Sequence, residues 1–310
     1  EGCNDDVNKI VWSALGWNPE ADVVDVLRQY ARYFIGPEWE DAFAEGLLAL
    51  ERNWQGPLLT NAGVYTTLAQ FQDMERRAAP QLLANWRFQA ALYRAYYDAC
   101  LRARLIHETA LEEQAMSVLR QAPKLGSLAA IERAQRILSR ADRPGPHSIW
   151  RARVFELAEA LFQSIRMQLS VPRYKAIAIE RGANLDSIDV PLNNRPWLEQ
   201  QFARIRGMPL EQDRLRAIDE IVDWTNPGPG GFYDDLGNRR LQPHLVVGPG
   251  FAEDPEFRRS ALTGFARDPS LRISWRAHAE ALYDAPLKMH YTHLNPRARY
   301  KVRVVYAGDA

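Results

Sequence analysis

The segment best suited to bind a ligand spans residues 223–238 and reads DWTNPGPGGFYDDLGN. Its two Pro remove amide donors and its four Gly favour a flexible backbone, so we expect no helix here. The segment is not a plain linker, because its three aromatic rings are costly to leave in water unless they pack or bind something. The role of the segment therefore depends on what these rings touch.

Two interpretations of this loop follow from its composition. In the first, the flat faces of Trp224, Phe232 and Tyr233 stack on the CH surfaces of a pyranose sugar, and Asp234 or Asp235 accepts hydrogen bonds from its hydroxyl groups. In the second, Trp224 and Phe232 hold an ordered loop against helices, and the two Asp cap a turn through Asx bonds. The first interpretation gives the candidate substrate-binding residues Trp224, Asn226, Phe232, Tyr233 and Asp235.

Asp234 and Asp235 are weak candidates for catalytic carboxylates. Glycosidases place two carboxyl groups about 5 Å apart for retention, or about 6.5 to 9.5 Å apart for inversion. Adjacent side chains of an extended backbone point apart, so these two Asp do not form such a pair by themselves. We therefore leave the catalytic residues unassigned, and whether the chain is an enzyme stays open.

Three further acids, Glu1, Asp5 and Asp6, lie within the first six residues. Carboxylates favour a helix N-terminus, so they are suited to cap a helix that begins near Val7. They are equally suited to rim a sugar pocket. We favour the cap for Asp6 and keep both roles open for Glu1 and Asp5, and we expect these acids to converge with the aromatic loop on one concave surface.

The spacing of residues in this sequence does not match the motifs of metal, nucleophile or nucleotide sites. HETALEE at 107–113 has Leu111 where a zinc protease needs its second His, so we expect a solvated helix face. His290 and His293 lie three apart, on opposite faces of an extended strand. The chain has no G-x-S-x-G motif, and the loop glycines do not open a helix after a strand. We expect no metal and no cofactor.

Most of the chain has the apolar spacing of helices. Asn18 and Pro19 have the types of an N-cap and a first-turn Pro, and the pattern then runs to Gly36. No Gly or Pro occurs between Pro80 and Pro123, which predicts one long amphipathic helix. Other expected helices lie in 37–56, between the breaks at 123–126 and 144–146, from about 150 to 165, and at 197–206 and 210–224.

The pattern changes to a period of two after Asp268. Apolar side chains alternate with polar ones over 287–292, the turn LNPRA follows, and YKVRVVY alternates again, which predicts a hairpin. The fold class is therefore mainly α: an irregular helical bundle with a small C-terminal β hairpin or the start of a β-sandwich. The expected parts are 1–19, a bundle over 20–170, an irregular helical lobe over 171–268 with a loop at 223–250, and a β segment over 269–310.

The opening segment EGCNDDVNKIVWSALGWNPEADVVDVLRQYARYFIG resembles a junction in glycoside hydrolases of the β-N-acetylglucosaminidase and α-glucuronidase types. There a (β/α)8 barrel ends in a polar, Asn-containing loop, an apolar segment and a W-N-P turn into a helical region. The resemblance puts residues 1–19 at the end of a barrel and Trp17-Asn18-Pro19 at the turn. It implies that Asn4, with Asn8 as the competing match, bonds sugar hydroxyls beside Asp5.

The tail LKMHYTHLNPRARYKVRVVYAGDA is similar to the entry into a galactose-binding-like β-sandwich. The two resemblances together imply a fragment of a larger carbohydrate-active protein, whose flanking domains hold most of the catalytic carboxylates. Carbohydrate and those flanking domains are then the expected partners, and a secreted or periplasmic location follows if the protein is carbohydrate-active. The alternative is a non-catalytic helical scaffold or protein-interaction module.

Charge and hydropathy exclude other partners. The 310 residues hold 39 basic and 39 acidic side chains, so no global charge favours nucleic acid or an anionic membrane surface. No apolar run approaches the roughly 18 to 20 residues that span a bilayer, and we expect a soluble chain. Cys3 and Cys100 are too few for a disulfide framework or a thiolate metal site.

Overall fold

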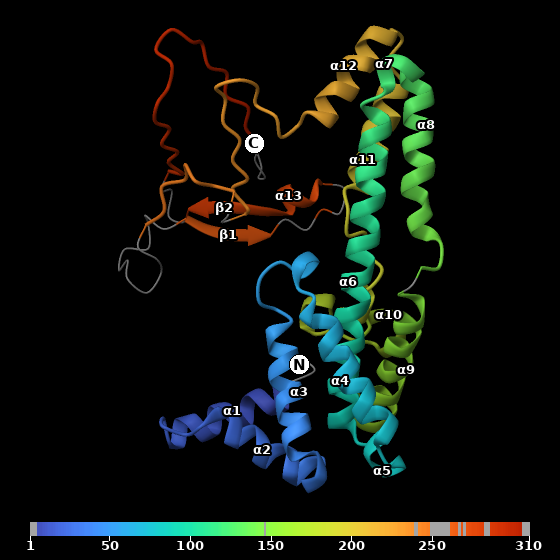
Figure 1. Cartoon of the computed structure of the whole chain (residues 1–310), viewed down its shortest axis with the longest axis vertical. Coiled ribbons are helices and arrows are strands. Elements are labelled where there is room, and N and C mark those ends of the chain that lie inside the picture. Colours follow the sequence, from blue (N-terminus) through green and yellow to red (C-terminus); the bar gives the residue numbers. More distant parts are fainter. Residues whose placement is uncertain are drawn as a thin grey trace. The chain divides into compact units, whose positions relative to one another are not determined.

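The computed structural model describes residues 5–145, 147–238, 241–248, 261–265, 268, 271–281 and 286–305. Helices occupy more than half of these residues, which confirms the predicted mainly α fold (Figure 1). The strands among them form one two-stranded antiparallel sheet. Contacts divide the chain into two compact units: Glu1–Glu108 with Ala141–Val190, and Thr109–Arg140 with Pro191–Ala310.

The secondary structure in the described residues of the first unit consists of helices and 3-10 turns, joined by loops. The long helix α6 (Trp86–Leu119) begins in this unit and ends in the second, and it confirms the single helix predicted between Pro80 and Pro123. The other helices of the first unit are α1 (Asp5–Trp17), α2 (Val23–Phe34), α3 (Glu40–Arg52), α4 (Gly63–Arg77), α5 (Pro80–Leu83), α9 (Ser148–Ile165) and α10 (Val171–Tyr174). Short 3-10 turns lie at Pro37–Trp39, Leu58–Thr60, Ser139–Asp142, Ile179–Arg181 and Asn184–Ser187.

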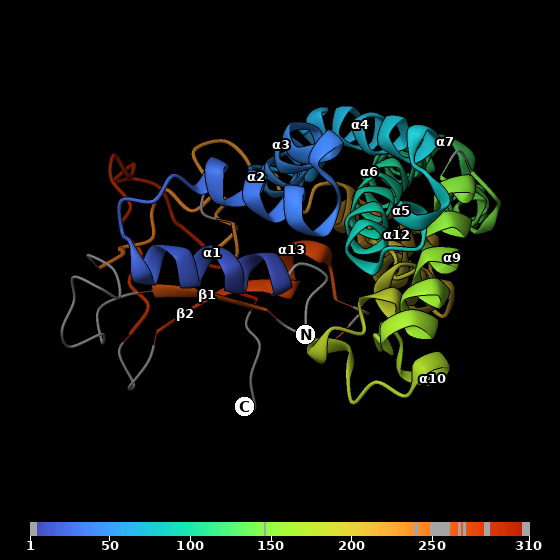
Figure 2. The ribbon, with the colours of Figure 1, turned by 90° about the horizontal axis from the view of Figure 1, so that it is seen from below.

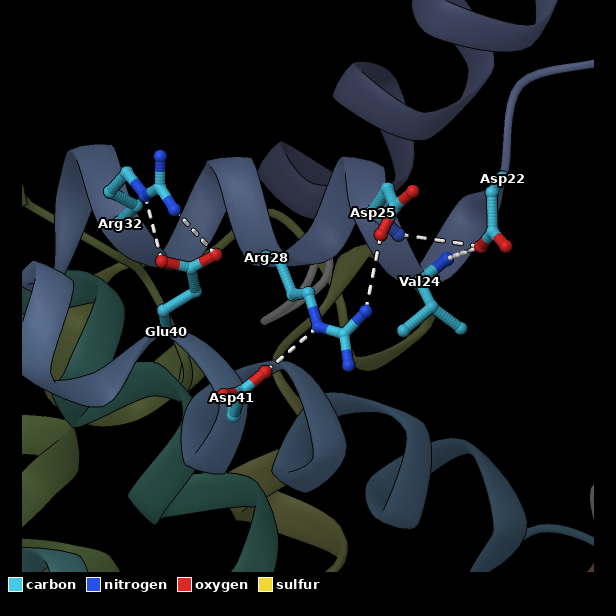
Figure 3. Close-up of polar contacts among 7 residues, drawn as sticks. All are labelled: Asp22, Val24, Asp25, Arg28, Arg32, Glu40 and Asp41. Carbon is cyan, nitrogen blue, oxygen red and sulfur yellow. Dashed lines mark hydrogen bonds and ion pairs between the residues drawn. The ribbon is translucent and has the colours of Figure 1, made fainter.

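The start of α2 differs from the predicted one. Asn18 ends α1, because its N–H donates to Ala14 O at 2.8 Å, and its side chain accepts from Glu20 N at 3.2 Å in a turn. Asp22 is the N-cap instead, accepting from the N–H groups of Val24 at 2.7 Å and Asp25 at 3.4 Å (Figure 3). Both side chains are good caps, so residue type alone did not decide between them.

Helix α2 lies beside α1 and packs against α3 (Figure 2). Tyr30, buried on α2, donates its hydroxyl to Asp6 of α1 at 2.8 Å, and Arg87 Nε donates to the same carboxylate at 2.8 Å. Asp6 thus lies in the first turn of α1, as expected, and also anchors that helix. Ion pairs between α2 and α3 (Figure 3) join Arg28 to Asp41 at 2.8 Å and Arg32 to Glu40 at 2.7 Å.

The core of the first unit is built on close aromatic contacts. Phe43 of α3 lies 6.2 Å from Phe71 of α4 and 6.1 Å from Phe88 of α6, between ring centroids, and all three side chains are fully buried. Gly46 lets α3 approach α4, because a Cβ at this position would lie 2.9 Å from the Phe71 ring. The 3.6-residue spacing of apolar side chains in the sequence produces this core.

A buried polar network crosses the same core. Asp98 of α6 is paired with Arg94 at 2.8 Å and accepts a hydrogen bond from Asn53 Nδ2 at 3.0 Å, and Asn53 Oδ1 accepts from Thr67 Oγ1 at 3.0 Å. Burial raises the pKa of Asp98, and the charge of Arg94 opposes that shift. The network therefore ties α3, α4 and α6 together. The ion pair between Arg94 and Asp98 offsets the cost of burying the Asp98 charge.

The helices of the second unit pack around a separate core. Phe202, Ile131 and Leu138 are among its fully buried side chains. Glu211 joins two of its helices, because its carboxylate accepts from Ser127 N at 2.7 Å and from Ser127 Oγ at 2.6 Å. The helices are the end of α6, α7 (Ala122–Leu125), α8 (Ser127–Leu138), α11 (Arg195–Arg206), α12 (Glu211–Val222) and α13 (Ile273–Arg276).

The hairpin predicted from the alternation after residue 286 is wrong in its position. The strands are β1 (Ala261–Phe265), which begins before Asp268, and β2 (Ala277–Ala281), paired antiparallel (Figure 1). Residues 286–305 contain no strand. Met289 instead forms an isolated antiparallel bridge with Leu245. Alternation tells which side chains share a face of an extended chain, but it does not choose the partner.

Candidate functional site

The loop after α12 is irregular, as its composition predicts. Gly228 and Gly230 have φ angles of 80° and 71°, in the left-handed region that favours glycine. The Asn226 side chain accepts from Gly228 N at 3.0 Å, and Gly231 N donates to Gly228 O at 3.1 Å. The candidate Asn226 therefore stabilises a turn, and the glycines permit it.

The far end of the loop packs on the sheet. Gly237 approaches Ala277 of β2 so closely that a Cβ would collide with the backbone carbonyl of Ala277. The Asp235 side chain accepts from Gly237 N at 3.3 Å, which is the Asx bond of the packing interpretation. Asp235 N also donates to Leu241 O at 2.7 Å. Asp235 thus holds the local backbone in this conformation.

Three rings from distant parts of the sequence meet beside this loop. Phe232 lies 5.0 Å from His244 and 5.0 Å from Tyr291, and His244 stacks on Tyr291 at 4.6 Å with an interplanar angle of 28°. The bridge between Leu245 and Met289 places them together, since His290 N donates to His244 O at 2.8 Å. We call Phe232, His244 and Tyr291 the ring cluster.

Asp234 fixes the polar edges of the ring cluster. Its carboxylate oxygens lie 3.0 and 3.1 Å from His244 Nδ1, and one of them accepts from the Tyr291 hydroxyl at 3.2 Å. A backbone bond from His244 N, at 3.4 Å, completes the set. The Asp234 side chain is only 6 % exposed, so it reaches a ligand through His244 and Tyr291 rather than directly.

This arrangement determines the tautomer of His244. A carboxylate only accepts hydrogen bonds, so Nδ1 carries a proton, and in the neutral imidazole Nε2 then carries the lone pair. No residue in the described part of the chain bonds Nε2, and the imidazole is 24 % exposed. The neutral imidazole of His244 is therefore a hydrogen-bond acceptor whose orientation is fixed by a carboxylate.

Trp224 does not belong to the ring cluster. It forms edge-to-face contacts with Trp197 of α11 at 6.3 Å and Trp275 of α13 at 5.0 Å, and these two lie 5.8 Å apart. Arg303 lies over the Trp224 ring, with Cζ 3.7 Å from its centroid, and Arg272 lies within 5.9 Å of all three Trp rings. Trp224 thus ties the loop to α11 and α13, as the packing interpretation expects.

Tyr233 and Asp235 lie near this Trp group. Burial raises the pKa of Tyr233 and of Asp235, and it lowers the pKa of Arg272. Among the described residues, the Nε and Nη1 atoms of Arg272 have no hydrogen-bond partner. Asp235 and Tyr233 therefore lie close to the partly buried cation Arg272, which weakens the case for either as a direct contact to sugar.

The amino-terminal candidates are only partly placed. Glu1 and Asn4 lie outside the described residues, and Asp5 begins α1. The acids at the start of α1 belong to the first unit and the aromatic loop to the second, and their convergence stays a prediction.

The solvated face predicted for 107–113 is wrong for Glu108. Glu108 is buried and paired with Arg104, whose guanidinium also donates to the carbonyls of Ile188 and Val190. Glu112 accepts from Asn194 in the second unit, at 2.6 and 2.8 Å. The prediction failed because this helix face contacts residues that are distant in the sequence, and the local sequence pattern does not show such partners.

Sequence reasoning missed His244 and the role of Tyr291. His244 sits alone in the segment LQPHLVV, with no second titratable residue at a meaningful spacing. The alternation over 287–291 did place Tyr291 on one face with Met289, and that was the only local signal. The pairing of these two segments is a tertiary feature.

Within the described residues, no three His, Cys, Asp or Glu side chains gather as a metal site. None of the described helices is both long and apolar enough to cross a bilayer. Cys100 is a buried free thiol whose pKa burial raises to about 11, and Cys3 lies outside the described residues. Comparison of the chain with models of known protein families, with characterised proteins and with solved structures finds no match.

Proposed function

We propose that the ring cluster is a carbohydrate-binding surface, and that the chain is the helical region of a glycoside-hydrolase-like, polysaccharide-processing protein. The observation that supports this is the arrangement of Phe232, His244 and Tyr291 within 5.0 Å of one another over a carboxylate that orients two of them. The catalytic carboxylate pair is assigned to other parts of the parent protein.

The chemistry of a pyranose suits this surface. Aromatic faces bind its CH groups, and fixed polar atoms at the ring edges select its hydroxyl groups. Phe232 is 37 % exposed and supplies the apolar face. The lone pair on His244 Nε2 accepts a hydrogen bond from a sugar hydroxyl, because Asp234 keeps the proton on Nδ1.

The test is calorimetric titration of the full 310-residue chain with N-acetylchitotetraose and with a glucuronoxylan oligosaccharide. Phe232→Ala removes the apolar face, and we expect it to weaken binding by roughly tenfold or more, since truncation of an aromatic residue that anchors a binding site costs about 2 kcal/mol or more. Tyr33→Ala, which removes an 82 % exposed aromatic ring from α2, is the matched control and leaves binding unchanged. The proposal is contradicted if the wild type and Phe232→Ala bind every tested sugar with equal affinity. It is also contradicted if the wild type binds neither of the two sugars.

A second function is favoured by the Trp group. Because Trp224 clasps α11 and α13, the loop is also suited to be part of a non-catalytic helical scaffold or interaction module. In that case the ring cluster only packs, and Phe232→Ala lowers the melting temperature without any effect on sugar binding.

A further inference from the structure

A surface cavity of about 590 Å³, largely open to solvent, is lined only by residues of the first unit. It is bounded by α9, by α10 and by the 3-10 turns Ile179–Arg181 and Asn184–Ser187. Its size falls within the range of about 300 to 1,000 Å³ that is typical of small-molecule sites. Its apolar wall is made by Phe155, Val171, Pro172, Ile179 and Leu185.

The two carboxylates at the cavity already have partners. Asp189 forms a two-point pair with Arg151, from Nε at 2.8 Å and from Nη2 at 2.5 Å, and these hydrogen bonds lower the pKa of Asp189. Asp186 accepts from Ser170 Oγ at 2.6 Å and from Val171 N at 2.7 Å. Neither carboxylate needs a further cation.

Arg173, which also lines the cavity, differs from these two carboxylates in the contacts of its side chain. Its guanidinium lies over the Phe155 ring, with Cζ 4.9 Å from the centroid, and Arg151 lies over the same ring at 4.5 Å. In the described part of the chain, no carboxylate or carbonyl accepts a hydrogen bond from the Arg173 side chain. An Arg carries five N–H donors and stays charged, so its fork at the cavity wall is open to an anion.

We propose that this cavity binds a small organic acid, with a compact apolar body against the Phe155 wall and a carboxylate paired with Arg173. The planar guanidinium matches a planar carboxylate through two parallel hydrogen bonds, which a spherical anion does not reproduce as well. The apolar wall favours an aromatic or branched aliphatic body over a fully hydrated ion. This site is independent of carbohydrate binding at the ring cluster.

The experiment uses 2-naphthoate and its uncharged amide as probes, titrated into the full chain by calorimetry. We expect saturable binding of 2-naphthoate and binding of 2-naphthamide that is weaker by roughly tenfold or more, since hydrogen bonds between two charged groups are stronger than those to a neutral amide. Arg173→Gln is expected to reduce the affinity for naphthoate to that for the amide. Raising the salt concentration should weaken only the binding of naphthoate.

Arg166→Gln is the matched control. Arg166 follows the same helix α9, is exposed, and lies over Phe162 at 5.3 Å without lining the cavity, so its removal leaves naphthoate affinity unchanged. The proposal is overturned if naphthoate does not bind, if the amide binds as tightly, or if Arg173→Gln and Arg166→Gln reduce affinity equally. Sugar binding, measured on the same Arg173→Gln protein, is expected to be unchanged.

Discussion

Asp234 holds His244 by both carboxylate oxygens, at 3.0 and 3.1 Å from Nδ1, while one of those oxygens also accepts the Tyr291 hydroxyl at 3.2 Å. One buried acid thereby orients two rings that lie 47 residues apart in the sequence (291 − 244 = 47). The polar edges of the ring cluster are thus set before any ligand arrives, and this pre-organisation is what a binding site needs.

We predict that Asp234→Asn destabilises the second unit by about 1 to 3 kcal/mol, because the amide group replaces an acceptor by a donor beside Nδ1. Tyr291→Phe removes only one hydrogen bond and should cost about 0.5 to 1.5 kcal/mol. Urea unfolding followed by near-ultraviolet circular dichroism measures both. A smaller effect for Asp234→Asn than for Tyr291→Phe would contradict the view that Asp234 organises the cluster.

The ion pair in the core of the first unit gives a second prediction. Arg94→Met leaves Asp98 buried without its cation, and we expect a loss of about 3 to 5 kcal/mol at neutral pH. Burial already raises the folded-state pKa of Asp98, and removal of Arg94 raises it further, so the charged form is what destabilises the fold. The loss should therefore shrink as pH falls and Asp98 becomes protonated.

The double variant Arg94→Met with Asp98→Asn is the control for that pH dependence, since its buried amide does not titrate. Its stability is expected to stay flat where that of Arg94→Met recovers. A recovery of equal size in the double variant would assign the pH effect to other groups.

Glu211 gives a pH dependence of opposite sign. Hydrogen bonds from Ser127 are the main reason that its pKa falls from 4.5 to about 2. A carboxylate whose folded-state pKa lies below its unfolded value stabilises the fold above pH 4.5 and loses this contribution as pH falls towards about 2. Glu211→Gln should therefore lower the melting temperature at pH 7 and differ little from the wild type near pH 2.

Glu132→Gln, on an exposed face of α8, is the matched control for Glu211→Gln. It removes an exposed carboxylate that pairs with Arg136 only at 3.9 Å, so its melting temperature should follow that of the wild type at every pH. A melting temperature of Glu211→Gln that is unchanged at pH 7 would show that the contact between Glu211 and Ser127 does not stabilise the second unit.

A substitution at Trp224 tests whether this ring packs the loop against α11 and α13 or contacts a ligand. We predict that Trp224→Ala costs up to about 3 kcal/mol, because it removes a ring packed between Trp197 and Trp275. Trp17→Ala removes a ring that is 93 % exposed and should cost under about 0.5 kcal/mol. Thermal unfolding compares the two, and equal melting temperatures would leave Trp224 free for another role.

The sequence by itself determined the helices and the irregular loop. Apolar side chains at helical spacing between Pro80 and Pro123 gave α6, and the Gly and Pro residues of the segment 223–238 gave a loop without a helix. These features depend on residues close in the chain, whose conformational preferences act locally. Even here the exact start of α2 was decided by which of two good caps, Asn18 or Asp22, reached free N–H groups.

Only the tertiary structure decided which side chains meet. Contacts group Ala141–Val190 with the first helices, and they group Thr109–Arg140 with Pro191–Ala310. His244 and Tyr291 become neighbours through the bridge between Leu245 and Met289, and Trp224 turns away from Phe232 to join Trp197. A strand's alternation fixes its faces but not its partner, and an aromatic ring gains similar free energy against any apolar surface, so residue type alone leaves these pairings undetermined.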